Sequence, residues 1–123
     1  ASDYGIISPD HRIYEPNKKI NYKGVNFNTP ISYSVAKSGI ISMTKYLATY
    51  WAKKGIRVNC VSPTGVEKQK QDKQFVKQLS ERIPLGRMAK SDELNGAIIY
   101  LCSNASSYVT GHNLVVDGGR TIW

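Results

Sequence analysis

The stretch "YSVAKSGI", residues 33–40, places Tyr33 and Lys37 four positions apart among small residues. On a helix, positions i and i+4 lie on one face, so a phenol and an ammonium group can reach the same point. A neighbouring positive charge favours the phenolate, lowers the pKa of a tyrosine and equips it to exchange a proton near neutral pH. A pair without function on an exposed helix has the same spacing, so the surrounding sequence must separate these two interpretations.

Two other Tyr and Lys pairs in the chain have this spacing. Tyr14 and Lys18 flank Pro16, which disfavours a helix through them. Tyr50 and Lys54 fall at the end of a predicted helix, where a cation complements the helix dipole without any further role. The pair at residues 33–40 lies instead in the first turns of that helix, and its small neighbours allow a flat ligand to come close.

Hydrophobic patterning predicts one long helix, over residues 31–53. Thr29 and Pro30 are typical of a helix start, with the threonine hydroxyl as cap, and Gly55 is typical of a left-handed helix end. Gly39 costs about 1 kcal/mol relative to alanine inside a helix. We therefore expect a close packing contact at this glycine.

The rest of the chain predicts short strands that alternate with helices. Such alternation favours an α/β fold with parallel strands, yet two or three strands are too few for a complete sheet. We therefore expect another segment or molecule to complete the core, and we expect Ser91 to cap the last helix. The expected elements, in chain order, are a strand end over 1–7, a long loop over 8–29, the helix over 31–53, a strand over 56–62, a helix within 72–82, a helix over 91–103 and a strand over 112–117. In the helix within 72–82, Phe75, Val76 and Leu79 share one face and predict an apolar stripe.

The composition is that of a globular domain, and the formal net charge of +8 raises the question of a nucleic-acid partner. The basic residues are dispersed, and the densest run, "EKQKQDKQFVKQ", carries one aromatic residue, so nucleic-acid binding is disfavoured. No apolar run approaches the roughly 20 residues of a membrane helix. Cys60 and Cys102 do not have metal-ligand spacing, and we expect buried free thiols, no metal site and a reducing, cytoplasmic setting.

Three blocks, "YSVAKSGI", "GIRVNCVSPTGV" and "RIPLGRMAKSDELNGAIIYLCSNASSYVTGHNLVVDGG", resemble consecutive landmarks of the short-chain dehydrogenase/reductase family. They occur in the family's order and cover nearly everything from residue 31 onward. The resemblance implies the C-terminal part of a doubly wound parallel-sheet (Rossmann-type) domain, incomplete as given. The residue pattern is most similar to that of bacterial members tied to flagellin modification and surface-sugar biosynthesis. This resemblance implies a small-molecule substrate, with a sugar or sugar nucleotide as one candidate.

The resemblance assigns catalytic roles to three residues. Tyr33 would be the acid/base, and Lys37 would lower its pKa and hydrogen-bond the nicotinamide ribose. Ser2, in "SDYG" with a matching Gly5, would hold the substrate oxygen. The segment between this serine and the tyrosine is longer than in most members, so we expect the insertion over residues 8–29 to shape the substrate pocket.

The resemblance also implies a nicotinamide site after the strand at residues 56–62. Pro63, Gly65 and Val66 match the family pattern, and the valine backbone would meet the nicotinamide carboxamide. Thr64 stands where the family usually has glycine, and Lys68 stands where threonine is common. We therefore expect binding of NAD or NADP with altered detail.

The Gly-rich turn that holds the dinucleotide pyrophosphate does not occur in the sequence. The resemblance therefore implies that residues 1–123 are a single C-terminal segment of an oxidoreductase, with the Gly-rich half preceding Ala1. We expect the isolated chain to be inactive and to bind dinucleotide weakly. The alternatives are a non-catalytic module that forms homo-oligomers through the broadly apolar helix at 31–53 and, less favoured, a basic nucleic-acid-binding module.

Overall fold

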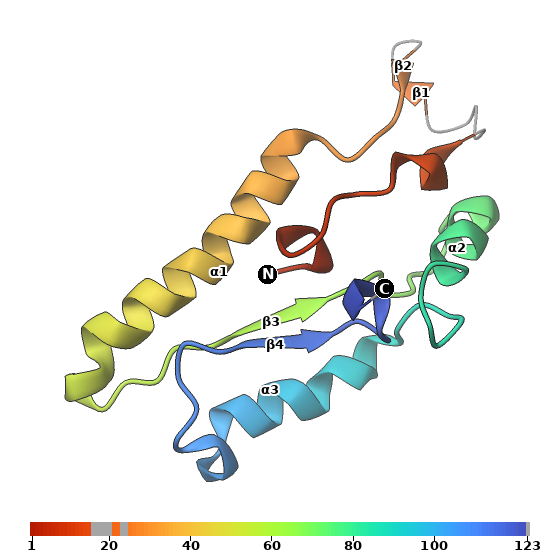
Figure 1. Ribbon diagram of the computed structural model, residues 1–123. Coiled ribbons are helices and arrows are strands. Elements are labelled where there is room, and N and C mark those ends of the chain that lie inside the picture. The colour runs from red at the N-terminus through yellow and green to blue at the C-terminus, as the bar shows by residue number, and fades with distance from the viewer. Residues whose placement is uncertain (16–20, 23–24, 123) are drawn as a thin grey trace.

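The computed structural model of the chain describes residues 1–15, 21–22 and 25–122. Its centre is a parallel pair of strands, β3 and β4, with the helices α1 and α3 on opposite sides (Figure 1). The helices and strands, in chain order, are β1 (Asn21–Tyr22), β2 (Val25–Asn26), α1 (Ile31–Trp51), β3 (Cys60–Pro63), α2 (Lys73–Ser80), α3 (Asn95–Cys102) and β4 (Asn113–Val116).

The pairing of β3 with β4 confirms the predicted fold class. The two strands run parallel with Cys60 opposite Asn113, and the chain between them passes through α2 and α3. Parallel strands need such a crossover connection, and their sheets are normally covered on both faces. The described residues thus form part of a doubly wound sheet and contribute two of its parallel strands.

The strand expected over residues 56–62 begins later, at Cys60. In the residues before it, side chains bind the chain to the end of α3 and to the loop that precedes β4. The Arg57 guanidinium donates hydrogen bonds to the carbonyl oxygens of Leu101 and Val109, and the Asn59 side chain donates to the same Val109 oxygen. Strand hydrogen bonding therefore starts only where β4 comes alongside.

The long helix is confirmed as α1, but two predictions about it are wrong. Thr29 does not cap it, because its hydroxyl lies 2.7 Å from the Tyr14 hydroxyl; Pro30 is the cap residue and makes no side-chain cap bond. Gly39 has no close packing contact, since a Cβ placed there would find nothing within 4 Å among the described residues. The helical end at Gly55, with a φ of 74°, is as expected.

The predicted helix over 91–103 starts with a short 3₁₀ turn, Ser91–Leu94, followed by α3. Ser91 is not its cap. The Glu93 carboxylate accepts the Lys90 backbone N–H at 2.7 Å and also pairs with Arg87, and these bonds, the one from Arg87 first, lower the pKa of Glu93 to about 2. An acidic side chain reaching back thus takes the place of the serine hydroxyl.

The prediction of free cysteines is right, but neither of the two is buried. Both thiols are free, but Cys102 is exposed at the end of α3 and Cys60 is half-buried. The core among the described residues lies elsewhere, under α2, where Leu79, Ile83 and Met88 are buried. The apolar stripe predicted for the helix within 72–82 thus faces this cluster.

The segment 8–29, expected as a loop, contains regular structure. Asp10 caps a 3₁₀ helix, His11–Tyr14, by accepting the Arg12 backbone N–H, and Ile13 in this helix is only 2% exposed. Further along, β1 and β2 pair antiparallel. The prediction was wrong because elements this short, with a single buried isoleucine, leave little periodicity in the sequence. Residues 16–20 and 23–24 of the segment lie outside the described part of the chain.

Candidate active site

A pocket of about 450 Å³ opens where the N-terminal turn, the start of α1 and the segment after β3 meet. Ser2, Tyr33, Gly65 and Val66, four of the residues expected at a site, line it together. They lie far apart in the sequence, so the tertiary fold brings them to one place. Lys37 and Pro63, the other two expected residues, are not part of its lining.

Tyr33 and Lys37 lie in the first two turns of α1 and are in contact with each other. The lysine Nζ is 5.1 Å from the centroid of the tyrosine ring. The Tyr33 ring also contacts the Tyr4 ring edge to face, with the ring centroids 6.3 Å apart. The Tyr33 side chain is 40% exposed, so it keeps access to the pocket while a cation and a second ring hold its position.

Ser2 caps a 3₁₀ turn, Asp3–Gly5, where the sequence analysis expected the end of a strand. Its hydroxyl accepts the Tyr4 backbone N–H at 3.3 Å and donates to the Asp3 carboxylate at 2.8 Å. The serine is only 6% exposed. Two neighbours in the turn therefore define where its oxygen points.

Gly5 brings this serine turn against α1. A Cβ at this position would lie 2.8 Å from the carbonyl carbon and oxygen of Lys37, which is closer than real Cβ contacts. The Ser38 hydroxyl donates to the Gly5 carbonyl oxygen at 3.1 Å. The Ser-x-x-Gly spacing thus has a physical reason here: glycine lets the serine turn pack on the helix beside the Tyr33 and Lys37 pair.

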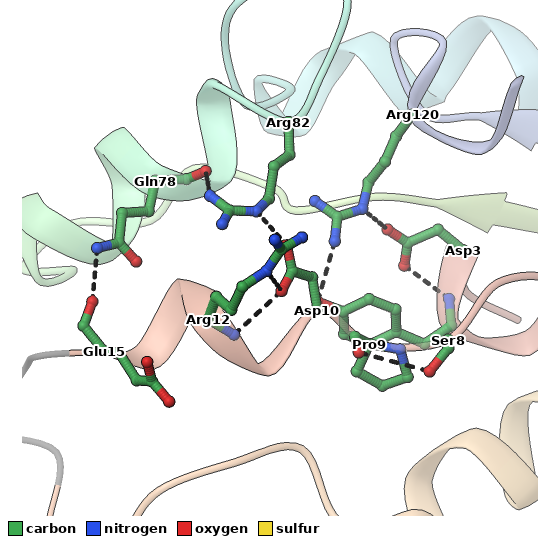
Figure 2. A network of polar contacts seen from close by, with 10 residues as sticks. Asp3, Ser8, Pro9, Asp10, Arg12, Glu15, Gln78, Arg82 and Arg120 are labelled. Carbon is green, nitrogen blue, oxygen red and sulfur yellow. Dashed lines mark hydrogen bonds and ion pairs between the residues drawn. The ribbon is translucent and has the colours of Figure 1, made fainter. Parts of the chain in front are cut away.

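Asp3 is the centre of a buried polar network that the sequence analysis missed. One carboxylate oxygen, Oδ2, accepts the Thr64 hydroxyl at 2.8 Å. The same oxygen lies 3.0 Å from Arg120 Nε, as Figure 2 shows. Arg120 also donates to the Tyr4 hydroxyl at 3.2 Å. Burial raises the pKa of the Tyr4 phenol well above its usual range, although the Arg120 charge opposes this shift. The network explains why position 64 is a threonine, because a glycine has no hydroxyl group to bind the Asp3 carboxylate.

The backbone of Val66, a residue that lines the pocket, is only partly hydrogen-bonded within the described chain: its carbonyl oxygen accepts Gln71 Nε2 at 3.5 Å. It forms a parallel bridge with Ala89, in which Gly65 O accepts the Ala89 N–H and Ala89 O accepts the Glu67 N–H. In such a bridge the central residue's N–H and C=O point away from the partner. Within the described part of the chain no group accepts from the Val66 N–H. A carboxamide in the pocket could bind there, which fits a nicotinamide.

Gly65 and Pro63 each have a structural role that does not involve a ligand. A Cβ at Gly65 would clash with Leu79 Cδ2 and lie 2.9 Å from Met88 Cε, so the glycine lets the core under α2 reach the pocket edge. Pro63 pairs with Val116 at the end of β3. Their predicted part in cofactor binding stays a prediction.

Aromatic side chains from the 8–29 segment and from α2 line the same pocket and were not among the expected site residues. Tyr14 stacks on Phe75, with centroids 5.8 Å apart and planes 13° apart, and meets Phe27 edge to face at 5.1 Å. All three line the pocket with Tyr33. The signal in the sequence was the presence of two aromatic residues, Tyr14 and Phe27, within the insertion. Only the fold brings Phe75 to them.

Two kinds of site are absent from the described residues. No group of three or more His, Cys, Asp or Glu side chains could hold a metal ion there. No helix in the described ranges is both long enough and apolar enough to cross a membrane. His11 and His112 are exposed and contribute no side-chain contact to the pocket lining.

Comparison with known proteins agrees with this geometry. A family model described as enoyl-(acyl carrier protein) reductase matches residues 20–121. D-arabinitol 2-dehydrogenase (ribulose-forming) of Candida albicans is 43% identical over 98 residues, covering 74% of this chain and 35% of that protein. The 2-dehydro-3-deoxy-D-gluconate 5-dehydrogenase of Escherichia coli is 38% identical over 93 residues, covering 72% of this chain and 37% of that protein.

A solved structure gives the same result for the fold. A short-chain dehydrogenase from Leptospira borgpetersenii with bound NAD+ superposes with a TM-score of 0.86 at 43% identity, covering 99% of this chain and 42% of that chain. The chain belongs to the short-chain dehydrogenase/reductase family. It spans less than half the length of the relatives named here.

Proposed function

We propose that this chain is the C-terminal segment of an NAD(P)-dependent oxidoreductase that transfers a hydride between the cofactor and a carbonyl or alcohol carbon. The observation that carries the proposal is the meeting of Ser2, Tyr33 and Val66 in one pocket. The bound NAD+ in the Leptospira relative supports the choice of cofactor. Because the chain covers about two fifths of that relative, we propose that a Gly-rich N-terminal half completes the enzyme.

Each residue would have a distinct part in the reaction. Bound NAD(P) supplies a hydride to the carbonyl carbon in reduction and accepts it from the alcohol carbon in oxidation. Tyr33 gives its phenolic proton to the substrate oxygen in reduction and takes it back in oxidation, so charge and atoms balance. Ser2 holds that oxygen by a hydrogen bond, and Lys37 places a positive charge beside the tyrosine ring.

The cofactor would rest on groups that the fold leaves available. Val66 lines the pocket and its N–H has no acceptor among the described residues, so we propose that this N–H binds the carboxamide oxygen of the nicotinamide. The Lys37 ammonium, one turn from Tyr33, can donate to the adjoining ribose hydroxyls. These contacts orient the ring and would leave the choice between NAD and NADP to residues elsewhere.

Replacement of one phenol tests the catalytic assignment. Tyr33→Phe in the full-length protein should abolish turnover, because the ring remains but its proton is lost. Tyr46→Phe, on the same helix and 66% exposed at its side chain, is the matched control and should retain activity. Circular dichroism should show the same fold for both variants. Normal turnover by Tyr33→Phe would show that the acid/base assignment is wrong.

A second test concerns the isolated chain. Without a Gly-rich turn it lacks the backbone N–H groups that bind a pyrophosphate, so we expect neither activity nor tight dinucleotide binding. Titration of the 123-residue chain with NADH and NADPH in a calorimeter measures this directly. Micromolar affinity for either dinucleotide would contradict the proposed division of the enzyme.

We propose a polyhydroxylated substrate of the sugar class. The Escherichia coli relative is named for a sugar acid and the Candida albicans relative for a sugar alcohol. A role in flagellin modification or in surface-sugar biosynthesis, and a location in the cytoplasm, stay predictions. Screening the full-length protein against sugar alcohols, sugar acids and sugar nucleotides with both dinucleotides tests the substrate class.

A second candidate function is self-association through α1. Val35, Met43, Tyr46 and Tyr50 on this helix are each more than half exposed, from 52% to 66%. Apolar surface of this kind favours burial against another protein surface. Light scattering of the full-length protein over a range of concentrations tests it, and a monomer at the highest concentration would count against homo-oligomers.

A further inference from the structure

An aromatic wall lines the pocket that holds Tyr33, and it is made of Tyr14 and Phe27 from the inserted segment and Phe75 from α2. We propose that this wall binds the non-reacting part of the substrate, and that this part is a ring with an apolar face, as in a pyranose sugar. The proposal rests on the proposed function in one respect: it takes the pocket with Ser2 and Tyr33 to be where the reacting carbon lies.

The geometry of the wall suits a flat partner. Tyr14 and Phe75 are stacked on each other, with planes 13° apart, and the ring of Phe27 stands at 84° to that of Tyr14. Phe27 is 43% exposed, although burial of its ring would be favourable. An apolar ring face placed against it would remove that surface from water.

The wall is held in place before any ligand arrives. The Tyr14 hydroxyl lies 2.7 Å from the Thr29 hydroxyl, which fixes the tyrosine ring relative to the start of α1. Ile13, the residue before Tyr14 in the same 3₁₀ helix, is buried. Rigid aromatic surfaces bind with little loss of conformational entropy, because few side-chain torsions must be ordered.

Polar contacts join the inserted segment to α2 and to Arg82, which follows this helix (Figure 2). Arg82 Nε lies 2.5 Å from an Asp10 carboxylate oxygen, and Gln78 donates its side-chain N–H to the Glu15 carbonyl oxygen at 2.6 Å. These bonds connect the segment that carries Tyr14 to the helix that carries Phe75. The stacking of Tyr14 on Phe75 therefore lies between two elements that hydrogen bonds also connect, the inserted segment and α2.

The chemistry around the wall distinguishes a ring from an open chain. A pyranose has C–H groups on its faces and hydroxyl groups around its edge, so it needs an apolar surface with polar groups at the rim. Thr29, Lys68 and Gln71 line the same pocket beside the aromatic rings and can bind such hydroxyls. An open-chain polyol presents hydroxyls in all directions and would leave some of them unpaired against the rings.

Ligand binding to the full-length protein tests the inference without relying on turnover. Saturation-transfer NMR would compare methyl β-D-glucopyranoside with D-sorbitol as ring and open-chain probes of similar size. We expect the glycoside to bind more tightly and its face protons to shift upfield from the ring currents. Phe27→Leu, which keeps an apolar side chain, should weaken the glycoside about two- to tenfold, the range of aromatic stacking energies.

Two further variants make the result specific. Tyr108→Leu, a fully exposed aromatic residue away from the pocket lining, should leave both ligands unaffected. Tyr14→Phe retains the stacked ring and loses only the bond to Thr29, so it should keep the preference for the glycoside. If Phe27→Leu fails to fold, the comparison of the two ligands on the wild-type protein still decides.

The outcomes separate this inference from the proposed function. Equal binding of sorbitol and glycoside to the wild type, or equal weakening of both by Phe27→Leu, would overturn the aromatic wall as a ring site. Glycoside binding with the expected variant pattern but no hydride transfer from any sugar would support the wall and count against the oxidoreductase. Turnover that strongly favours open-chain substrates would support the enzyme and overturn the wall.

Discussion

Arg120 lies with its Nε atom 3.0 Å from Asp3 Oδ2, and the two side chains are only 4% and 6% exposed. The pair joins the two ends of the described chain. Because the same carboxylate accepts the Ser2 hydroxyl, and the same guanidinium binds Tyr4 beside Tyr33, the pair supports two of the three proposed catalytic residues, Ser2 and Tyr33. It is a positioning device that contacts neither reacting atom in our proposal.

Removal of one partner of this pair should be strongly destabilising. Arg120→Met leaves a buried carboxylate without its charge partner, and such losses cost about 3 to 5 kcal/mol of unfolding free energy. The double variant Asp3→Asn with Arg120→Met should recover most of that loss, because no uncompensated charge remains. Urea unfolding of the full-length protein measures both. A double variant as unstable as the sum of the single variants would contradict the coupling.

Thr64 should contribute through its hydroxyl alone. Thr64→Val keeps the shape and leaves the Asp3 carboxylate one buried hydrogen bond short, which should cost about 1 to 3 kcal/mol in unfolding free energy. Thr64→Ser keeps the donor, so its stability and its kcat/KM should stay near those of the wild type. If valine is tolerated as well as serine, the hydrogen bond seen at 2.8 Å contributes nothing measurable.

Two glycines should respond in opposite directions to the same change. Gly5→Ala places a methyl group 2.8 Å from the Lys37 carbonyl, so the serine turn must move away from α1, and both stability and turnover should fall. Gly39→Ala has open space, and alanine is favoured over glycine in a helix by up to about 1 kcal/mol. Thermal unfolding and kcat/KM measure both. Equal effects at the two positions would show that the Gly5 contact is unimportant.

The Asp10 ion pairs should make stability depend on pH. Hydrogen bonds from Arg12 first and from Arg82 hold the pKa of Asp10 well below its usual range, although desolvation opposes them. A carboxyl with a lowered folded-state pKa stabilises the protein above its unfolded pKa, about 4, and this stabilisation is lost as the pH falls further.

Asp10→Asn should therefore lose up to about 1 kcal/mol at pH 7, because the pairs are partly exposed. The difference from the wild type should shrink as the pH falls below about 4. Urea unfolding at pH 7 and at pH 3 measures it, with Glu67→Gln as a control at an exposed acidic residue. A difference that stays constant with pH would contradict the ion-pair explanation.

Local patterns predicted the elements well where one segment sets its own structure. The apolar stripe with Phe75, Val76 and Leu79 predicted α2, and the left-handed Gly55 ends the 3₁₀ turn Ala52–Lys54 that continues α1. The predictions of the helix caps were wrong for a physical reason. A cap hydroxyl can bind any suitable partner in the folded protein, and Thr29 lies beside Tyr14 instead of the helix backbone.

The sequence by itself determined the contact of Tyr33 with Lys37, because one turn of helix separates them and no distant contact is needed. It also determined the parallel α/β class, through short strands that alternate with helices. Only the tertiary structure decided that Asp3 meets Arg120 and that Tyr14 stacks on Phe75. Pairs so far apart in the chain leave no periodic pattern, since packing of separate elements alone brings them together.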